Sequence, residues 1–142
     1  MRRLSMLGLL AVVFAAGFVA RGAVTPLSAQ GNARVFEIRT YTAPDGKLAD
    51  LHARFRNHTL RIFAKHGMTN IGYFAPQDSP LSQNTLIYVL AHSSREAAKK
   101  SWADFQADPE WQKVAADSQV NGRIVTKVES VFADATDYSP LK

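Results

Sequence analysis

The segment that decides the fold reads Arg34-Val-Phe-Glu-Ile-Arg-Thr-Tyr41. Its side chains alternate with a period of two, as they do in a half-buried strand. The more apolar face carries Phe36, Ile38 and Thr40. The other face carries Glu37, Arg39 and Tyr41. We expect the apolar face to pack against the core and the Glu37 face to lie on the side of the sheet without helices.

Helix and strand signals follow this segment in order. Lys47 to His66 carries apolar residues at helical spacing and stops before Gly67. Thr69 to Pro76 has the composition of a short strand. Thr85 to His92 is apolar enough to be a central strand. One long helix followed by two strands is therefore expected in the first half of the domain.

Two capping signals start the second helical region. Ser93-Ser94-Arg95-Glu96 matches a capping box in which Ser93 is the cap. Asp108-Pro109-Glu110 restarts the helix, because Asp108 can cap and proline fits the first turn. Ile124 to Phe132 alternates as a last strand.

The element order is β-α-β-β-α-β, which is typical of a ferredoxin-like α+β fold. That fold has a four-stranded antiparallel sheet with both helical regions on one face. The opposite sheet face must then contact water or a partner.

The first 30 residues differ from the rest of the chain. A basic Met1-Arg2-Arg3 start precedes the apolar run Leu4 to Ala20, and Ala20 to Gln30 is small and polar. This layout predicts a signal peptide over residues 1–30, a domain over residues 31–142, and a periplasmic or secreted protein. The alternative is an uncleaved membrane anchor, since 17 apolar residues lie at the lower limit for crossing a bilayer.

Composition excludes several classes of protein. The net charge is +5, but Arg2, Arg3 and Arg21 belong to the N-terminal segment, so the remainder is near +2. A dedicated nucleic-acid binder needs a concentrated basic surface, so we predict no nucleic-acid partner. The absence of cysteine rules out disulfides and thiolate metal sites. We find no metal-binding motif and expect no metal site.

Several segments are more specific than the element order. They are Phe36-Glu-Ile-Arg-Thr-Tyr41, Asn57-His-Thr-Leu60, Phe63-Ala-Lys-His-Gly67, Gly72-Tyr73, Ser101-Trp-Ala-Asp-Phe105, Asp108-Pro-Glu-Trp111 and Tyr138-Ser-Pro140. Together they resemble the NIPSNAP family over residues 34 to 141, and the stretch from Trp102 to Trp111 is the most telling.

The resemblance implies a dimeric α/β-barrel, in which two ferredoxin-like sheets pack through their open faces. A homodimer would then bury the face assigned to Glu37, Arg39 and Tyr41, together with Lys127 and Glu129 from the last strand. Such charges must pair with each other across subunits or with a bound ligand. Both alternatives, pairing across subunits and ligand binding, remain open. The family has no settled chemistry, and its wider fold group includes cofactor-free oxygenases and haem-degrading enzymes.

His58 is the histidine that falls in the apolar series of the first helix. It is either a hydrogen-bonded core histidine or a general base or haem ligand beside the barrel. His66 precedes Gly67 and suits a helix C-terminus, where the helix dipole favours a positive imidazole.

These observations predict an exported homodimer that binds a small apolar or anionic ligand, or a partner protein, without a cofactor. The candidate ligand-binding residues are Glu37, Arg39, Tyr41, His58 and Tyr73. Catalytic residues remain unassigned. The alternative is a cofactor-free or haem-dependent oxygenase that uses His58, Arg39 and Tyr73.

Overall fold

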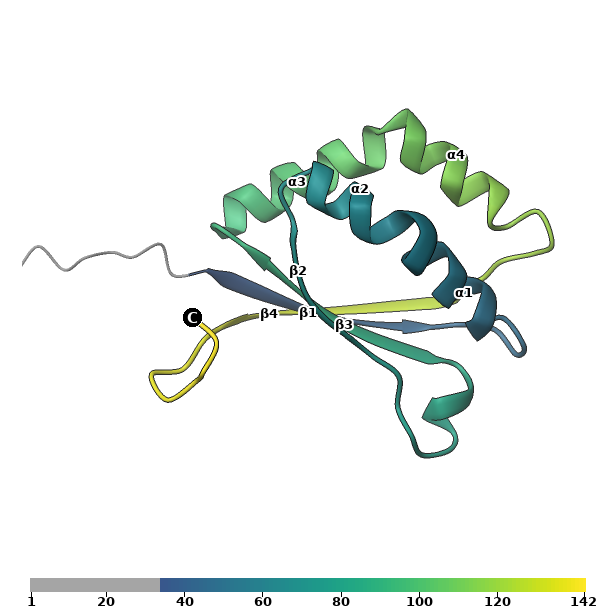
Figure 1. Cartoon of the computed structure of the whole chain (residues 1–142), viewed down its shortest axis with the longest axis horizontal. Helices are drawn as coiled ribbons and strands as arrows, with labels where there is room; N and C mark the ends of the chain where they lie inside the picture. Colours follow the sequence, from purple (N-terminus) through teal and green to yellow (C-terminus); the bar gives the residue numbers. More distant parts are fainter. Residues whose placement is uncertain (1–33) are drawn as a thin grey trace, which may run out of the picture.

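The sheet is built from four antiparallel strands, seen in the computed structural model of the protein (Figure 1). The structure describes residues 34–142, so the signal segment predicted over residues 1–30 lies outside the described residues. No helix within residues 34–142 combines the length and the apolar character needed to cross a membrane.

The strands are β1 (Val35–Thr42), β2 (Thr69–Phe74), β3 (Thr85–His92) and β4 (Lys127–Asp134). Their order across the sheet is β2-β3-β1-β4, which is the ferredoxin-like arrangement and confirms the predicted fold class. β4 begins three residues later than expected, because it pairs in register with the whole of β1, from Thr42 opposite Lys127 to Val35 opposite Asp134.

The helices α1 to α4 all lie on one side of the sheet (Figure 1). The first helical region consists of α1 (Leu48–Arg54), a π-helical turn η1 (Phe55–Thr59) and α2 (Leu60–Lys65). The second consists of α3 (Arg95–Ala107) and α4 (Pro109–Asp117), and a short 3-10 turn η2 (Leu81–Gln83) precedes β3.

The π-helical turn corrects the expectation of one regular helix. The Leu60 N–H bonds to the Phe55 carbonyl five residues back, so this turn is wider than an α-helical turn. Thr59 consequently takes the buried position, and His58 is exposed. The prediction that His58 lies on the inner side of the helix was wrong for this reason.

The helix ends follow the capping signals with one correction. Ser94, not Ser93, is the N-cap of α3, and its hydroxyl accepts from the Ala97 N–H. Asp108 caps α4 and accepts from the Glu110 N–H, as predicted. Gly67 has a φ of 77°, so the chain leaves α2 through a conformation that glycine adopts without strain.

The core fills the space between the helices and the sheet. Leu51, Ile62 and Phe63 come from the helices, and Tyr88 and Leu90 come from the central strand β3. Each of these side chains is almost fully buried.

The two faces of β1 are the reverse of the expectation. Glu37 accepts a hydrogen bond from Trp102 of α3, and Tyr41 packs edge-on against Phe55 with ring centroids 5.7 Å apart. The polar face therefore lies beneath the helices. An alternating pattern separates two faces without saying which one is covered, and Glu37 can be buried because several donors surround it.

The open face is the apolar one. Ile38, Phe74 and Val131 are 37%, 56% and 59% exposed and lie on this side of the sheet. Lys127 and Glu129 also face this side, where they pair with each other at 2.9 Å. The predicted grouping of these two residues with Glu37 was therefore wrong.

Candidate functional site

A pocket of about 580 Å³ opens between α3 and the β4 edge of the sheet. The strands β1 and β4 form its floor, and the first turns of α3 form its wall. Its lining consists of Glu37, Arg39, Arg95, Glu96, Lys99, Trp102, Ser130 and Phe132. Basic side chains and two aromatic rings thus share one cavity.

Glu37 is the centre of the hydrogen-bond network in this pocket. Its side chain is 1% exposed, and Oε1 accepts from Arg39 at 2.6 Å and from Ser130 at 2.7 Å. Oε2 accepts from Trp102 Nε1 at 2.7 Å and lies 2.9 Å from His92 Nε2. Burial by itself would raise the pKa of Glu37, but these four hydrogen bonds outweigh it and lower the pKa to about 2. The carboxylate is therefore ionised at neutral pH.

Arg39 is held in place by Glu37 and by an aromatic ring. Its guanidinium lies 4.1 Å from the centre of the Trp102 ring, which favours a cation stacked on the indole. The Nε of Arg39 is buried and has no hydrogen-bond partner among residues 34–142. One donor of this fixed arginine thus remains unused.

The helix α3 adds two more cations. Arg95, Lys99 and Trp102 occupy successive turns of one face of this helix. Arg95 lies 3.6 Å from the centre of the Phe132 ring of β4. The pocket also lies beside the N-terminal end of α3, where the helix dipole is positive. These features together favour an anion.

The sequence matches the model of a known protein family. The NIPSNAP family model matches residues 36–140. The chain belongs to the NIPSNAP family. Among curated proteins, none matches the chain.

Solved structures of NIPSNAP proteins share the fold. A NIPSNAP family protein with unknown function from Agrobacterium tumefaciens is 22% identical, with a TM-score of 0.68, over 79% of this chain and 96% of that one. A second NIPSNAP family protein from the same organism is 25% identical, with a TM-score of 0.67, over 77% of this chain and 91% of that one.

A more distant structure has the same fold. SnoaB, a cofactor-independent oxygenase from Streptomyces nogalater, is 14% identical, with a TM-score of 0.51. The match covers 76% of this chain and 98% of SnoaB. At this identity the likeness concerns the fold alone.

Of the five candidate residues, this NIPSNAP structure brings only Glu37 and Arg39 together in the pocket. Tyr41 and Tyr73 belong to an aromatic cluster around Tyr88, with ring centroids 5.3 Å and 5.5 Å from it. The Tyr73 hydroxyl donates to Asn70, and burial raises the pKa of Tyr73, so its phenol stays protonated.

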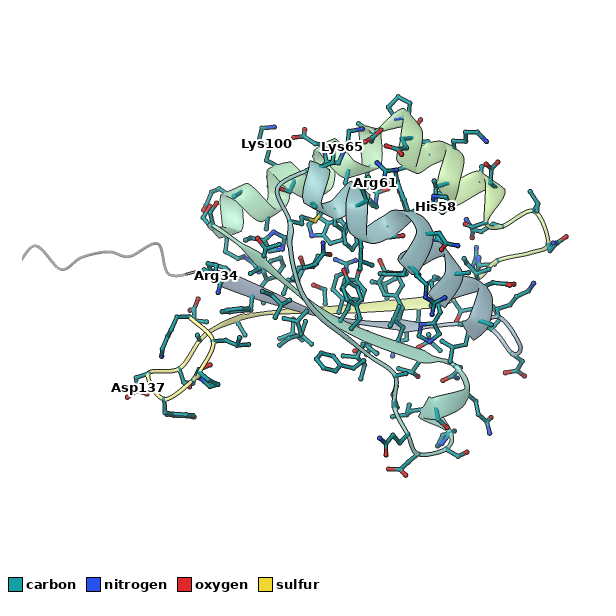
Figure 2. The ribbon with its side chains drawn as sticks, in the orientation of Figure 1. Arg34, His58, Arg61, Lys65, Lys100 and Asp137 are labelled. Carbon is teal, nitrogen blue, oxygen red and sulfur yellow. The ribbon has the colours of Figure 1, made fainter. Side chains whose placement is uncertain are left out.

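The histidines lie apart from one another. Exposed His58 lines a second pocket, on the side of the helix that faces α4 (Figure 2). His66 is the C-cap of α2, and its Nε2 lies 2.6 Å from Asp108. Hydrogen bonds from Lys65 and His66 lower the pKa of Asp108. His66 therefore ties the first helical region to the start of α4.

Sequence reasoning missed several residues around Glu37. His92 and Ser130 carry no local signal, because each meets Glu37 only through strand pairing. Trp102 was noted only as part of the family-like stretch, yet its indole N–H donates to Glu37. One signal in the sequence pointed to the α3 wall of the pocket, namely the helical spacing of Arg95, Lys99 and Trp102. Among residues 34–142, no group of three or more His, Asp or Glu side chains is placed to hold a metal ion.

Proposed function

We propose that the protein binds a small anion with an apolar or aromatic body in the pocket between α3 and β4. The observation that carries this proposal is Arg39, which Glu37 and Trp102 fix in place beside Arg95 and Lys99. A guanidinium suits carboxylate and phosphate groups because its N–H donors match pairs of oxygens.

The rest of the pocket fits such a ligand. Glu37 is already occupied by four hydrogen bonds, so it opposes an incoming anion less than a free carboxylate would. Trp102 and Phe132 offer aromatic surface next to the cations. A volume of about 580 Å³ lies in the range of small-molecule sites.

Calorimetric titration with benzoate tests this proposal, with benzyl alcohol as the uncharged analogue. We expect benzoate to bind and benzyl alcohol to bind more weakly by about tenfold or more, since a charge-assisted hydrogen bond is lost. The double substitution Arg95→Gln with Lys99→Gln should weaken benzoate binding by about the same factor.

Lys100→Gln is the matched control. Lys100 lies on the same helix but pairs with Asp104 on the outer side of α3, away from the sheet (Figure 2). It should leave benzoate binding unchanged. Equal binding of benzoate and benzyl alcohol, or equal losses in the double variant and in Lys100→Gln, would remove the support for an anion site here.

The open sheet face supports a homodimer as the functional unit. Ile38, Phe74 and Val131 expose apolar surface on this face, and the helices cover only the other one. An exposed apolar patch of this kind is typical of an interaction surface. Two such faces packed together would form the dimeric barrel that the family resemblance implies. Light scattering should give twice the mass of one chain, and a monomer at high concentration would contradict the proposal.

We also propose that the protein works outside the cytoplasm. The support is the tripartite pattern of residues 1–30, with its basic start, apolar run and small polar end. N-terminal sequencing of the protein recovered from a periplasmic fraction should begin between residues 20 and 33. Recovery of the intact N-terminus in the membrane fraction would instead favour the uncleaved anchor.

The alternative of an oxygenase in the same cavity has less support. A haem ligand or general base should face the cavity, yet none of the pocket-lining residues is a histidine. His92 uses its Nε2 on Glu37, and His58 lines the other pocket. A Soret shift on haem titration, or turnover of a quinol that His92→Gln abolishes, would reverse this preference.

A further inference from the structure

A second pocket, of about 360 Å³, lies between the first helical region and α4. Arg54, Asn57 and His58 line it from the end of α1 and the π-helical turn. Val114 and Asp117 line it from α4. The π-helical turn shapes this pocket, because the wider turn points Asn57 and His58 outward while Arg54 remains buried.

Arg54 is the unusual residue of this pocket. It is only 7% exposed, and its Nε has no hydrogen-bond partner. Among residues 34–142, no carboxylate oxygen lies within 4.0 Å of its guanidinium nitrogens, although nine other Lys, Arg and His side chains there form such pairs. Its guanidinium lies 5.2 Å from the centre of the Trp111 ring.

A buried arginine without a carboxylate is costly to the fold. Removing an ion from water requires compensation from an opposite charge or from hydrogen bonds. Arg39 receives both from Glu37, whereas Arg54 lies beside the Trp111 ring and near Tyr41 and Tyr88, without a carboxylate partner among residues 34–142. Burial accordingly lowers the pKa of Arg54. An arginine retained under these conditions suits a bound anion.

The rim of the pocket has the opposite charge. Asp50 and Asp117 line it, and each is bonded to a lysine on its own helix, Lys47 and Lys113 respectively. Both acids are more than half exposed, so these pairs are weak and open to exchange. The pocket thus combines a positive floor with a negative rim, which disfavours a ligand that carries negative charge alone.

We propose that this pocket is a binding site for a small zwitterionic carboxylate, whose carboxylate pairs with Arg54 and whose ammonium group lies at Asp50 and Asp117. This site is separate from the pocket between α3 and β4. Either one can bind its ligand if the other does not.

The probe is 4-aminobutyrate, which carries one charge at each end. Butyrate and butylamine each retain one of these charges and serve as matched controls. Titration into the isotope-labelled protein should shift the Arg54 Nε–H resonance, because the unused donor gains an acceptor. We expect 4-aminobutyrate to bind about tenfold more tightly than either control, since each control lacks one ion pair.

Arg54→Met keeps an unbranched apolar side chain beside Trp111 and removes the charge. It should reduce 4-aminobutyrate binding by about tenfold or more, while the melting temperature stays the same or rises, because an uncompensated buried charge is gone. Arg61→Met is the matched control, since Arg61 is exposed and pairs with Glu110, and it should leave binding unchanged. An arginine with a purely structural role would lower the melting temperature without altering a binding curve.

Asp117→Asn provides a second test that does not disturb the interior, because this side chain is 62% exposed. It should weaken 4-aminobutyrate binding severalfold and leave butyrate binding unchanged. The proposal is overturned if 4-aminobutyrate does not bind, if Arg54→Met binds it as well as the original protein does, or if butyrate binds equally well.

Discussion

The two faces of the sheet divide polar and apolar side chains in an unexpected way. The face beneath the helices holds an ionised glutamate, one arginine-lined pocket beside it and a buried histidine–carboxylate contact. The face without helices exposes Ile38, Phe74 and Val131. A monomer with one solvated sheet face usually has the reverse arrangement. The difference is consistent with both proposals, because the covered face carries the charged groups of the proposed ligand site and the open face carries the apolar groups of the proposed interface.

The largest effect should follow from Glu37→Gln on the covered face. A glutamine offers one acceptor where Glu37 serves four donors, and it leaves the charge of Arg39 unpaired. We expect a loss of about 3 kcal/mol in the free energy of unfolding, measured with urea. Glu129→Gln on the open face is the control and should stay within about 0.5 kcal/mol of the original protein. Similar losses of unfolding free energy in both variants would contradict the proposed difference between the two faces.

The second-largest effect should come from acid, which should weaken the interactions of Glu37 on the covered face. Folding lowers the pKa of Glu37 from 4.5 to about 2, so the folded protein binds fewer protons than the unfolded chain between these values. The contribution is complete above about pH 4.5 and is lost as the pH falls through about 2, and it amounts to on the order of 3 kcal/mol. Urea unfolding at several acidic pH values measures this loss, and its pH dependence should shrink in Glu37→Gln.

Val131→Asp should weaken association through the open face. In a homodimer this substitution buries two carboxylates without partners, so we expect the dimer dissociation constant to rise roughly a hundredfold. Val120→Asp is matched in chemistry and lies in a loop, where Val120 is 77% exposed. Sedimentation of both variants should show dissociation only in the first. Equal behaviour would mean that association uses another surface.

The smallest effect should come from Tyr88→Phe. The Tyr88 hydroxyl is fully buried and makes no hydrogen bond of good geometry, so its removal should change the unfolding free energy by less than about 1 kcal/mol or raise it. Tyr73→Phe provides the comparison, because its hydroxyl donates to Asn70, and should lower the free energy by about 1 kcal/mol. Thermal unfolding of the two variants distinguishes a paired from an unpaired phenol.

Most of the fold could be predicted because its signals are local. The strand of Thr85 to His92 has its expected bounds, and Asp108 with Pro109 starts a helix as its residue types indicate. The alternation in Arg34 to Tyr41 also predicted a strand correctly, but a period of two does not say which face of that strand is covered. That choice depends on His92, Trp102 and Ser130, which reach Glu37 only after the chain has folded.

The site was predicted in part for the same reason. Glu37 and Arg39 were selected as polar residues on a strand, and they do line a pocket together. Arg54 was not distinguished from the other basic residues of its helix, although it follows Leu51 by three residues and so lies on the buried side of α1. The π-helical turn moved His58 out of the apolar series.

That turn also gives the first helical region one residue more than a regular helix of the same length needs. A π-helical turn takes about one more residue to complete than an α-helical turn, so deleting one residue between Phe55 and Thr59 would restore a regular helix and leave Ile62 and Phe63 facing the core. Relatives with a regular helix at this place should therefore be one residue shorter here. A sequence alignment of relatives would show a single-residue gap within this five-residue stretch.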